Sequence, residues 1–273
     1  MIQLMFLPFL VCLVITGIHA YLGIHIVKRQ VIFVDLALAQ IAALGAIVAS
    51  IFGIEVHSSY AYVFALGFTF LGSLIFAFTR SKRRNIPQEA IIGIVYAITA
   101  AASILVLAKS TAESEHIKDM LVGNILFVDL PQIIKMAVLY LLVGIFHYIY
   151  RKNFIAVSED KDIVNKKKIN IRLWDFLFYA SIGVVVTLSV EIAGVLLVFS
   201  YLIVPSICAI MLANNMKSRL LLGWTIGALT SLIGLYFSAT YDFPTGAAIV
   251  CAFGAVLVLV WLAIIIFKIK VKK

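Results

Sequence analysis

Charged side chains are scarce in this chain of 273 residues: Asp, Glu, Lys and Arg make up 13% of it, while hydrophobic residues make up 64%. A soluble globular domain is on average about 25% charged and about 45–50% apolar, so this chain has too few polar side chains to cover a water-exposed globule. The shortage predicts an integral membrane protein. It argues against a self-contained soluble enzyme, a nucleic-acid-binding protein and a secreted scaffold.

Cysteine and catalytic motifs are also missing or few. The three cysteines, Cys12, Cys208 and Cys251, lie inside apolar runs without CxxC spacing, so neither a disulfide framework nor a thiolate metal site is expected. The chain has no GxxxxGK[ST] loop for nucleotide phosphates, no HExxH pattern and no GxSxG pattern. We therefore expect no enzymatic chemistry and no covalently bound cofactor in this polypeptide, which counts against an intramembrane metalloprotease.

What the chain does have is long apolar runs, each close to the roughly 20 residues that cross a bilayer as a helix. They cover 4–27, 31–52, 60–79, 90–108, 132–150, 173–193, 194–212, 220–239 and 245–267. None alternates as a membrane strand does, so we predict an all-α, polytopic transmembrane helical bundle of eight or nine spans. The count depends on 173–212, where we expect a turn near 191–194; a re-entrant break there would change it.

The net charge of +9 would suggest a nucleic-acid partner in a soluble protein. Here 19 of the 22 basic residues fall at 28–29, 80–84, 151–172, 217–219 and 268–273, and these clusters alternate with connections that hold few basic residues. By the positive-inside rule the clusters lie in the cytoplasm, which predicts a cell-membrane protein with its N-terminus outside and its C-terminus inside. The first run lacks a preceding basic region, so we expect a retained helix rather than a signal peptide.

Two segments of the single transmembrane domain, 1–273, do not fit a simple span or short loop. Residues 109–131 combine a polar stretch with an apolar piece that is too short to cross, which predicts an outer or re-entrant segment ending near Pro131. Residues 151–172 are charged and predicted to form a cytoplasmic loop. That loop either contacts a cytosolic partner or serves as a solvated linker.

Ionisable side chains at bilayer depth are costly and therefore mark functional sites by default. Among the acids in the apolar runs, we single out Asp35 and Glu191 as those at bilayer depth, together with Gln40 and His19. Their carboxylate, carboxamide and imidazole groups suit a divalent cation such as zinc, manganese or iron(II), so these four are candidates to line a metal route. Structural alternatives stay open: Asp35 pairs with Arg29 or caps a helix, Glu191 is solvated at a turn, and His19 bonds to a neighbouring helix.

Six stretches carry a family resemblance: 23–29 (GIHIVKR), 33–45 (FVDLALAQIAALG), 89–97 (EAIIGIVYA), 121–126 (LVGNIL), 194–205 (GVLLVFSYLIVP) and 241–246 (YDFPTG). In this order they resemble the membrane subunits of ABC transporters that import zinc, manganese or iron(II). The resemblance implies a dimeric permease with a second permease copy, a cytosolic ABC ATPase that alone binds ATP, and an extracellular or periplasmic metal-binding protein. Rival hypotheses are a secondary transporter or channel without an ATPase, and a permease for a metal chelate.

The resemblance also assigns a coupling role to 209–219, which is expected to form a short interfacial helix that receives the motion of the ATPase. The candidate coupling residues in it are Asn214, Asn215, Lys217 and Arg219.

The chain departs from the family pattern at one candidate site. Many family members carry histidine where this chain has Gln40, and aspartate where it has Leu36. The acid here is Asp35, about 140° from Gln40 around a regular helix, so the two share a face only if the helix is distorted.

Overall fold

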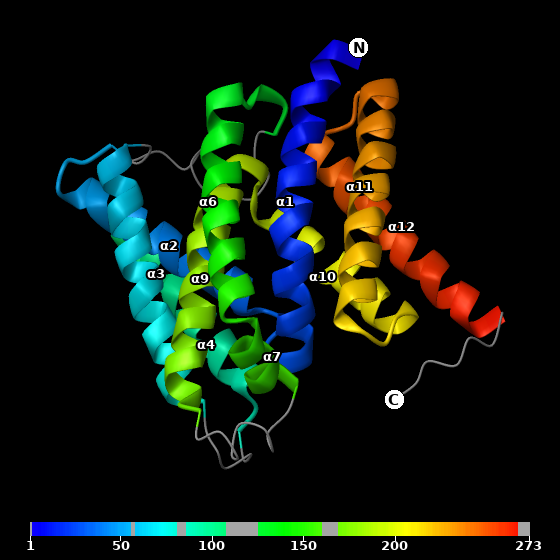
Figure 1. Cartoon of the computed structure of the whole chain (residues 1–273). Helices are drawn as coiled ribbons and strands as arrows, with labels where there is room; N and C mark the ends of the chain where they lie inside the picture. Colours follow the sequence, from blue (N-terminus) through cyan, green and yellow to red (C-terminus); the bar gives the residue numbers. More distant parts are fainter. Residues whose placement is uncertain (1, 56–57, 81–85, 108–124, 160–168, 267–273) are drawn as a thin grey trace. The chain divides into compact units, whose positions relative to one another are not determined.

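The computed structural model describes residues 2–55, 58–80, 86–107, 125–159 and 169–266, and every regular element in these ranges is helical (Figure 1). The elements are α1 (Ile2–Arg29), α2 (Val34–Ile51), α3 (Ser59–Thr79), α4 (Gln88–Leu107), η1 (Ile125–Phe127), α6 (Leu130–Ile149), α7 (Arg151–Glu159), α9 (Ile171–Ala193), α10 (Val195–Leu212), α11 (Met216–Tyr241) and α12 (Thr245–Ile266). The all-helical prediction is confirmed for this part of the chain.

Nine helices in the described ranges are long and apolar enough to cross a membrane, and each overlaps one of the nine predicted runs. At the start of α11 the helix boundary differs from the predicted one because a capping side chain sets it. Helix α11 begins at Met216, four residues before the predicted run, because the Asn215 side chain accepts a hydrogen bond of 2.7 Å from the Ser218 backbone N–H. Such a cap satisfies one of the free amides at a helix start, so the helix extends beyond its apolar stretch.

The long apolar stretch 173–212 is divided at Gly194, as predicted. Gly194 has φ +78°, in the left-handed region that a residue without a Cβ enters at little cost, and it separates α9 from α10. Pro205 lies inside α10 and has no backbone N–H, so the carbonyl of Tyr201 loses its regular helical partner. The stretch therefore supplies two of the nine candidate spans.

The chain divides into two compact units. The first comprises Met1–Val27, Asp119–Leu141 and Ser189–Lys273, and the second comprises Lys28–Lys118 and Leu142–Leu188. In the first unit α10, α11 and α12 pack on one another, and in the second α2 packs on α3 and α4.

Small residues permit close helix packing within each unit. A Cβ on Gly23 would lie 1.8 Å from the Leu202 carbonyl oxygen in the first unit, and one on Gly45 would lie 2.8 Å from the Phe64 carbonyl oxygen in the second. Only glycine fits such contacts, which is the packing typical of helices in membranes.

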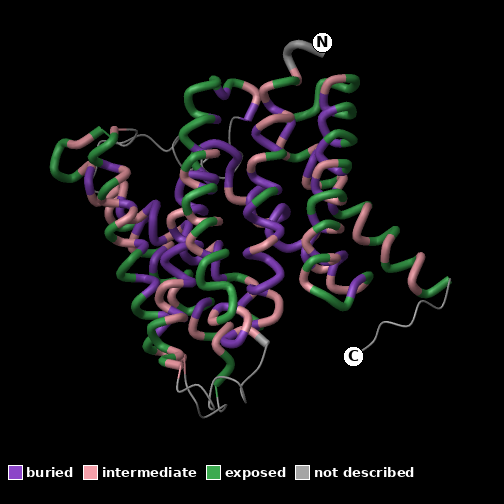
Figure 2. Tube along the Cα trace, in the orientation of Figure 1, coloured by how far each residue is buried: buried purple, intermediate pink, exposed green. Residues whose placement is uncertain are grey.

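Burial differs strongly between the spans. In α9 72% of the most apolar window is buried, whereas in α12 only 11% is (Figure 2). An apolar helix with so few buried residues cannot be stable in water, so its exposed face is expected to contact lipid.

The two segments set apart by the sequence are described only in part. Of 109–131, residues 109–124 lie outside the described ranges; the rest contains η1 and the start of α6, with Pro131 in the first turn of that helix. Of 151–172, residues 160–168 lie outside them; Arg151–Glu159 form α7, and α9 begins at Ile171.

The coupling segment 209–219 differs from the expected short interfacial helix. Helix α10 continues to Leu212 and α11 begins at Met216, so only three residues connect them. The difference has a local cause: the Asn215 cap starts α11 early and leaves no residues for a separate helix.

Candidate functional site

Asp35 is the second residue of α2, in the second unit, and its side chain is almost completely enclosed. The residue is 1% exposed, and its Oδ1 atom has no hydrogen-bond partner in the described part of the chain. Asp35 forms no ion pair within the described residues, because Arg29 donates instead to Asp175. The pairing alternative is therefore wrong. The capping alternative stays open, since Asp35 lies in the first turn of α2, where the free backbone amides of the helix start favour a carboxylate.

Gln40 lies on the same helix as Asp35 but has different neighbours. It is half-buried, and its Nε2 donates to the Ser103 hydroxyl of α4 at 3.3 Å, while that hydroxyl donates to the Thr99 carbonyl at 2.9 Å. Helix α2 is continuous from Val34 to Ile51, so no break brings Asp35 and Gln40 onto one face. The oxygen of the Gln40 carboxamide is the atom that this side chain can offer a cation.

His19 lies in the first unit and is completely buried within a hydrogen-bonded cluster. Its Nδ1 is 2.9 Å from the Ile15 carbonyl oxygen, and its Nε2 is 3.3 Å from the Ser189 hydroxyl. A carbonyl oxygen only accepts, so Nδ1 carries the proton and Nε2 of the neutral ring accepts from Ser189. The Tyr140 hydroxyl also bonds to Ser189. Both ring nitrogens are thus engaged, which favours the alternative of a histidine bonded to its neighbours.

Glu191 lies in the last turn of α9, in the first unit, and is exposed. The exposure favours the alternative of a solvated side chain at the turn before Gly194. The described residues contain no group of three or more His, Cys, Asp or Glu side chains placed to hold a metal ion. Asp35 and Gln40 belong to one unit, and His19 and Glu191 belong to the other.

The coupling candidates surround the connection between α10 and α11. Asn214 and Lys217 are exposed, whereas Asn215 caps α11. Arg219 is buried, and its Nε donates to the Ala213 carbonyl at 3.0 Å. Asn214 and Lys217 are thus open to a partner, while Arg219 stabilises the shape of the connection.

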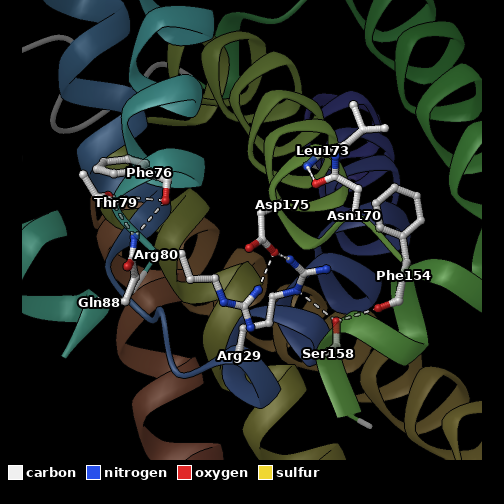
Figure 3. A network of polar contacts seen from close by, with 10 residues as sticks. All are labelled: Arg29, Phe76, Thr79, Arg80, Gln88, Phe154, Ser158, Asn170, Leu173 and Asp175. Carbon is white, nitrogen blue, oxygen red and sulfur yellow. Dashed lines mark hydrogen bonds and ion pairs between the residues drawn. The ribbon is translucent and has the colours of Figure 1, made fainter. Parts of the chain in front are cut away.

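Sequence reasoning missed a buried ion cluster in the second unit, formed by Arg29, Arg80 and Asp175. Figure 3 shows both guanidinium groups directed at the Asp175 carboxylate. Arg29 Nη1 is 2.7 Å from Asp175 Oδ1, and Arg80 Nη1 bonds to the same oxygen. The Arg29 Nε also donates to the Ser158 hydroxyl at 2.9 Å, and the guanidinium lies 3.7 Å from the Phe178 ring centroid.

The ion cluster connects the ends of several helices. Arg29 ends α1, Arg80 follows α3, Ser158 belongs to α7 and Asp175 lies near the start of α9. An acid inside the predicted run 173–193 was the signal for it in the sequence.

Comparison with known proteins supplies the family. The chain matches the model of the ABC 3 transport family (ABC-3) over residues 1–267. It is 31% identical over 195 residues to the manganese transport system membrane protein MntC of Listeria innocua, covering 69% of this chain and 67% of that protein. It is 26% identical to the manganese import system permease protein ScaB of Streptococcus gordonii, covering 88% and 84%.

A third relative and one solved structure agree with this family. The chain is 25% identical to a Haemophilus influenzae protein described as a probable iron transport system membrane protein, covering 88% of this chain and 86% of that protein. The structure of PsaBC from Streptococcus pneumoniae in complex with Fab superposes with a TM-score of 0.78 at 20% identity, covering 95% of this chain and 91% of that chain. At that identity the structural likeness shows the fold alone.

Proposed function

The chain belongs to the ABC 3 transport family and is the non-catalytic membrane permease of an ABC import system for metal ions, and we propose that its cargo is manganese(II). The donor atoms support this choice. The imidazole of His19 is occupied by hydrogen bonds, and Glu191 is exposed at the turn before Gly194. The remaining candidates are the carboxylate of Asp35 and the carboxamide oxygen of Gln40. Oxygen ligands suit manganese better than zinc, which favours imidazole and thiolate. Relatives described as manganese transport proteins point to the same ion.

The observation that carries the proposal is the unsatisfied Oδ1 of Asp35. A buried acceptor without a partner destabilises the folded protein by about 1–3 kcal/mol, and by more when it is charged. A group kept at this cost is expected to serve a function. A passing cation supplies the missing partner. Asp35 and Gln40 then act at successive points along α2, while His19 and Glu191 fall outside the proposed route.

Membership of an ABC transporter implies an ATPase and a binding protein as partners. We propose that the ATPase is cytosolic and contacts Asn214 and Lys217, that the binding protein delivers metal from outside, and that a second permease copy completes the pathway. The distribution of basic residues supports an outer N-terminus and an inner C-terminus. Alternating access follows, with ATP hydrolysis on the partner driving the two states.

Uptake complementation tests the cargo. The chain is expressed with its ATPase and binding protein in strains that lack manganese, zinc or iron(II) import, and cellular metal is measured. We expect the wild-type chain to rescue the strain that lacks manganese import. We expect Asp35→Asn to assemble with its partners but not to rescue that strain. Rescue of the zinc strain alone would overturn the choice of cargo, and unchanged manganese uptake by Asp35→Asn would remove that residue from the route.

A further inference from the structure

Glu89, the second residue of α4, approaches the start of α2. Its Oε1 accepts a hydrogen bond of 2.9 Å from the backbone N–H of Phe33, the residue that precedes α2. The bond holds the Glu89 carboxyl group at Phe33, which precedes Asp35 by two residues in the chain. The same hydrogen bond places the Glu89 carboxyl group at the start of α2, the helix whose first turn contains Asp35.

Both carboxyl groups retain an unsatisfied oxygen. Oδ1 of Asp35 and Oε2 of Glu89 are buried, and neither has a hydrogen-bond partner among the residues that the structure describes. The backbone N–H of Phe33 accounts for the other oxygen of Glu89, and Asp35 lies in the first turn of α2, where free backbone amides favour a carboxylate. These amides leave one oxygen on each carboxyl group without a partner among the described residues.

No described basic side chain neutralises these two acids. Among the described residues neither Asp35 nor Glu89 has an ion pair, and the nearest arginine in sequence, Arg29, donates to Asp175. Like charges held near each other are costly unless a cation compensates them, and the cost is greater for a side chain as enclosed as Asp35. The arrangement is thus complementary to a positive ion.

We propose that Asp35 and Glu89 together form a cation site between the first turns of α2 and α4 that binds a divalent metal ion on its way through the permease. The choice of manganese(II) as the ion rests on the proposed function. Two carboxylates leave most of the coordination positions of such an ion to water, which suits a site that the ion must leave again. Glu89 is the member that the sequence did not identify as a ligand.

The site is tested on the permease–ATPase complex, purified in detergent without the binding protein, whose own metal would mask the signal. Manganese(II) is titrated in, and the free ion is counted by electron paramagnetic resonance. Asp35→Asn and Glu89→Gln are each expected to weaken binding by about tenfold or more. The double variant is expected to bind more weakly than either single variant, but by less than the product of the two single effects, because both residues serve one ion and their effects are coupled.

A matched control and a stability measurement separate ligand binding from a structural role. Asp242→Asn removes an exposed acid that ends α11 in the left-handed conformation, which asparagine also tolerates, and is expected to leave binding unchanged. Manganese(II) is expected to raise the melting temperature of the wild-type complex and not that of Asp35→Asn or Glu89→Gln. Without metal, both variants are expected to be at least as stable as wild type, since each relieves a repulsion.

Two results would overturn the site. One is unchanged manganese(II) binding by the double variant; the other is metal-free destabilisation of both variants with no stabilisation of wild type by manganese(II), which indicates that a basic side chain pairs with the acids. The outcome is separable from the proposed function. Manganese uptake that is insensitive to both substitutions would overturn the proposed site and leave the proposed cargo standing. Uptake of zinc alone, with intact manganese(II) binding, would overturn the proposed cargo and leave the site standing.

Discussion

Asp175→Asn replaces the carboxylate to which both Arg29 and Arg80 donate by a neutral amide. The Arg29 side chain is 1% exposed, so water cannot replace the lost partner, whereas the Arg80 side chain is 29% exposed and remains partly hydrated. Breaking a buried pair costs about 3–5 kcal/mol because a charge stays buried without compensation. Loss of the Arg80–Asp175 pair, whose arginine is partly exposed, is expected to cost less than about 1 kcal/mol.

Thermal unfolding of the detergent-purified chain measures the difference. For a chain of this size about 1 kcal/mol corresponds to roughly 2–4 °C, so Asp175→Asn is expected to melt about 10 °C below wild type. Arg80→Gln is expected to melt within about 4 °C of wild type. Replacing both buried partners, Arg29→Met with Asp175→Leu, should recover much of the loss. Equal shifts for Asp175→Asn and Arg80→Gln, or no shift for Asp175→Asn, would refute the reasoning.

Three further predictions address packing, hydrogen bonding and selectivity. Gly23→Ala is expected to destabilise the chain, because the new Cβ meets a backbone oxygen of α10. Gly17→Ala in the same helix adds a Cβ that meets nothing within 4 Å and should be neutral or stabilising. The melting temperature of Gly23→Ala should therefore be below that of Gly17→Ala. Ser189→Ala leaves Nε2 of the buried His19 without its donor and is expected to cost about 1–3 kcal/mol, measured by the same unfolding assay. Gln40→His replaces a carboxamide oxygen by imidazole and is expected to shift metal uptake from manganese towards zinc, and an unchanged ratio in competition uptake would contradict that role.

The helices were predictable from the sequence because the length of an apolar run determines whether it can cross a membrane. All nine runs appear as helices, and Gly194 divides the longest stretch where its backbone freedom permits. The boundary at Asn215 was not predicted, since a capping side chain rather than hydrophobicity sets it.

The pairing of polar side chains was not predictable. Arg29 and Asp175 are 146 residues apart in the chain, and His19 and Ser189 are 170 apart, so no local pattern indicates which helices bring them together. Asp35 stood out as an acid in an apolar run. Glu89 gained significance only when α4 was found beside the start of α2.

Reconstitution in vesicles tests the central claim, that this chain is a metal permease powered by a separate ATPase. Purified permease is placed in liposomes with or without the ATPase, oriented so that ATP is supplied on the ATPase side and manganese-loaded binding protein on the other. The account predicts manganese accumulation that requires ATP, the ATPase and the binding protein together, and no ATP hydrolysis by the permease alone. Manganese movement through the permease alone at the same rate would contradict it and indicate a channel or a secondary transporter.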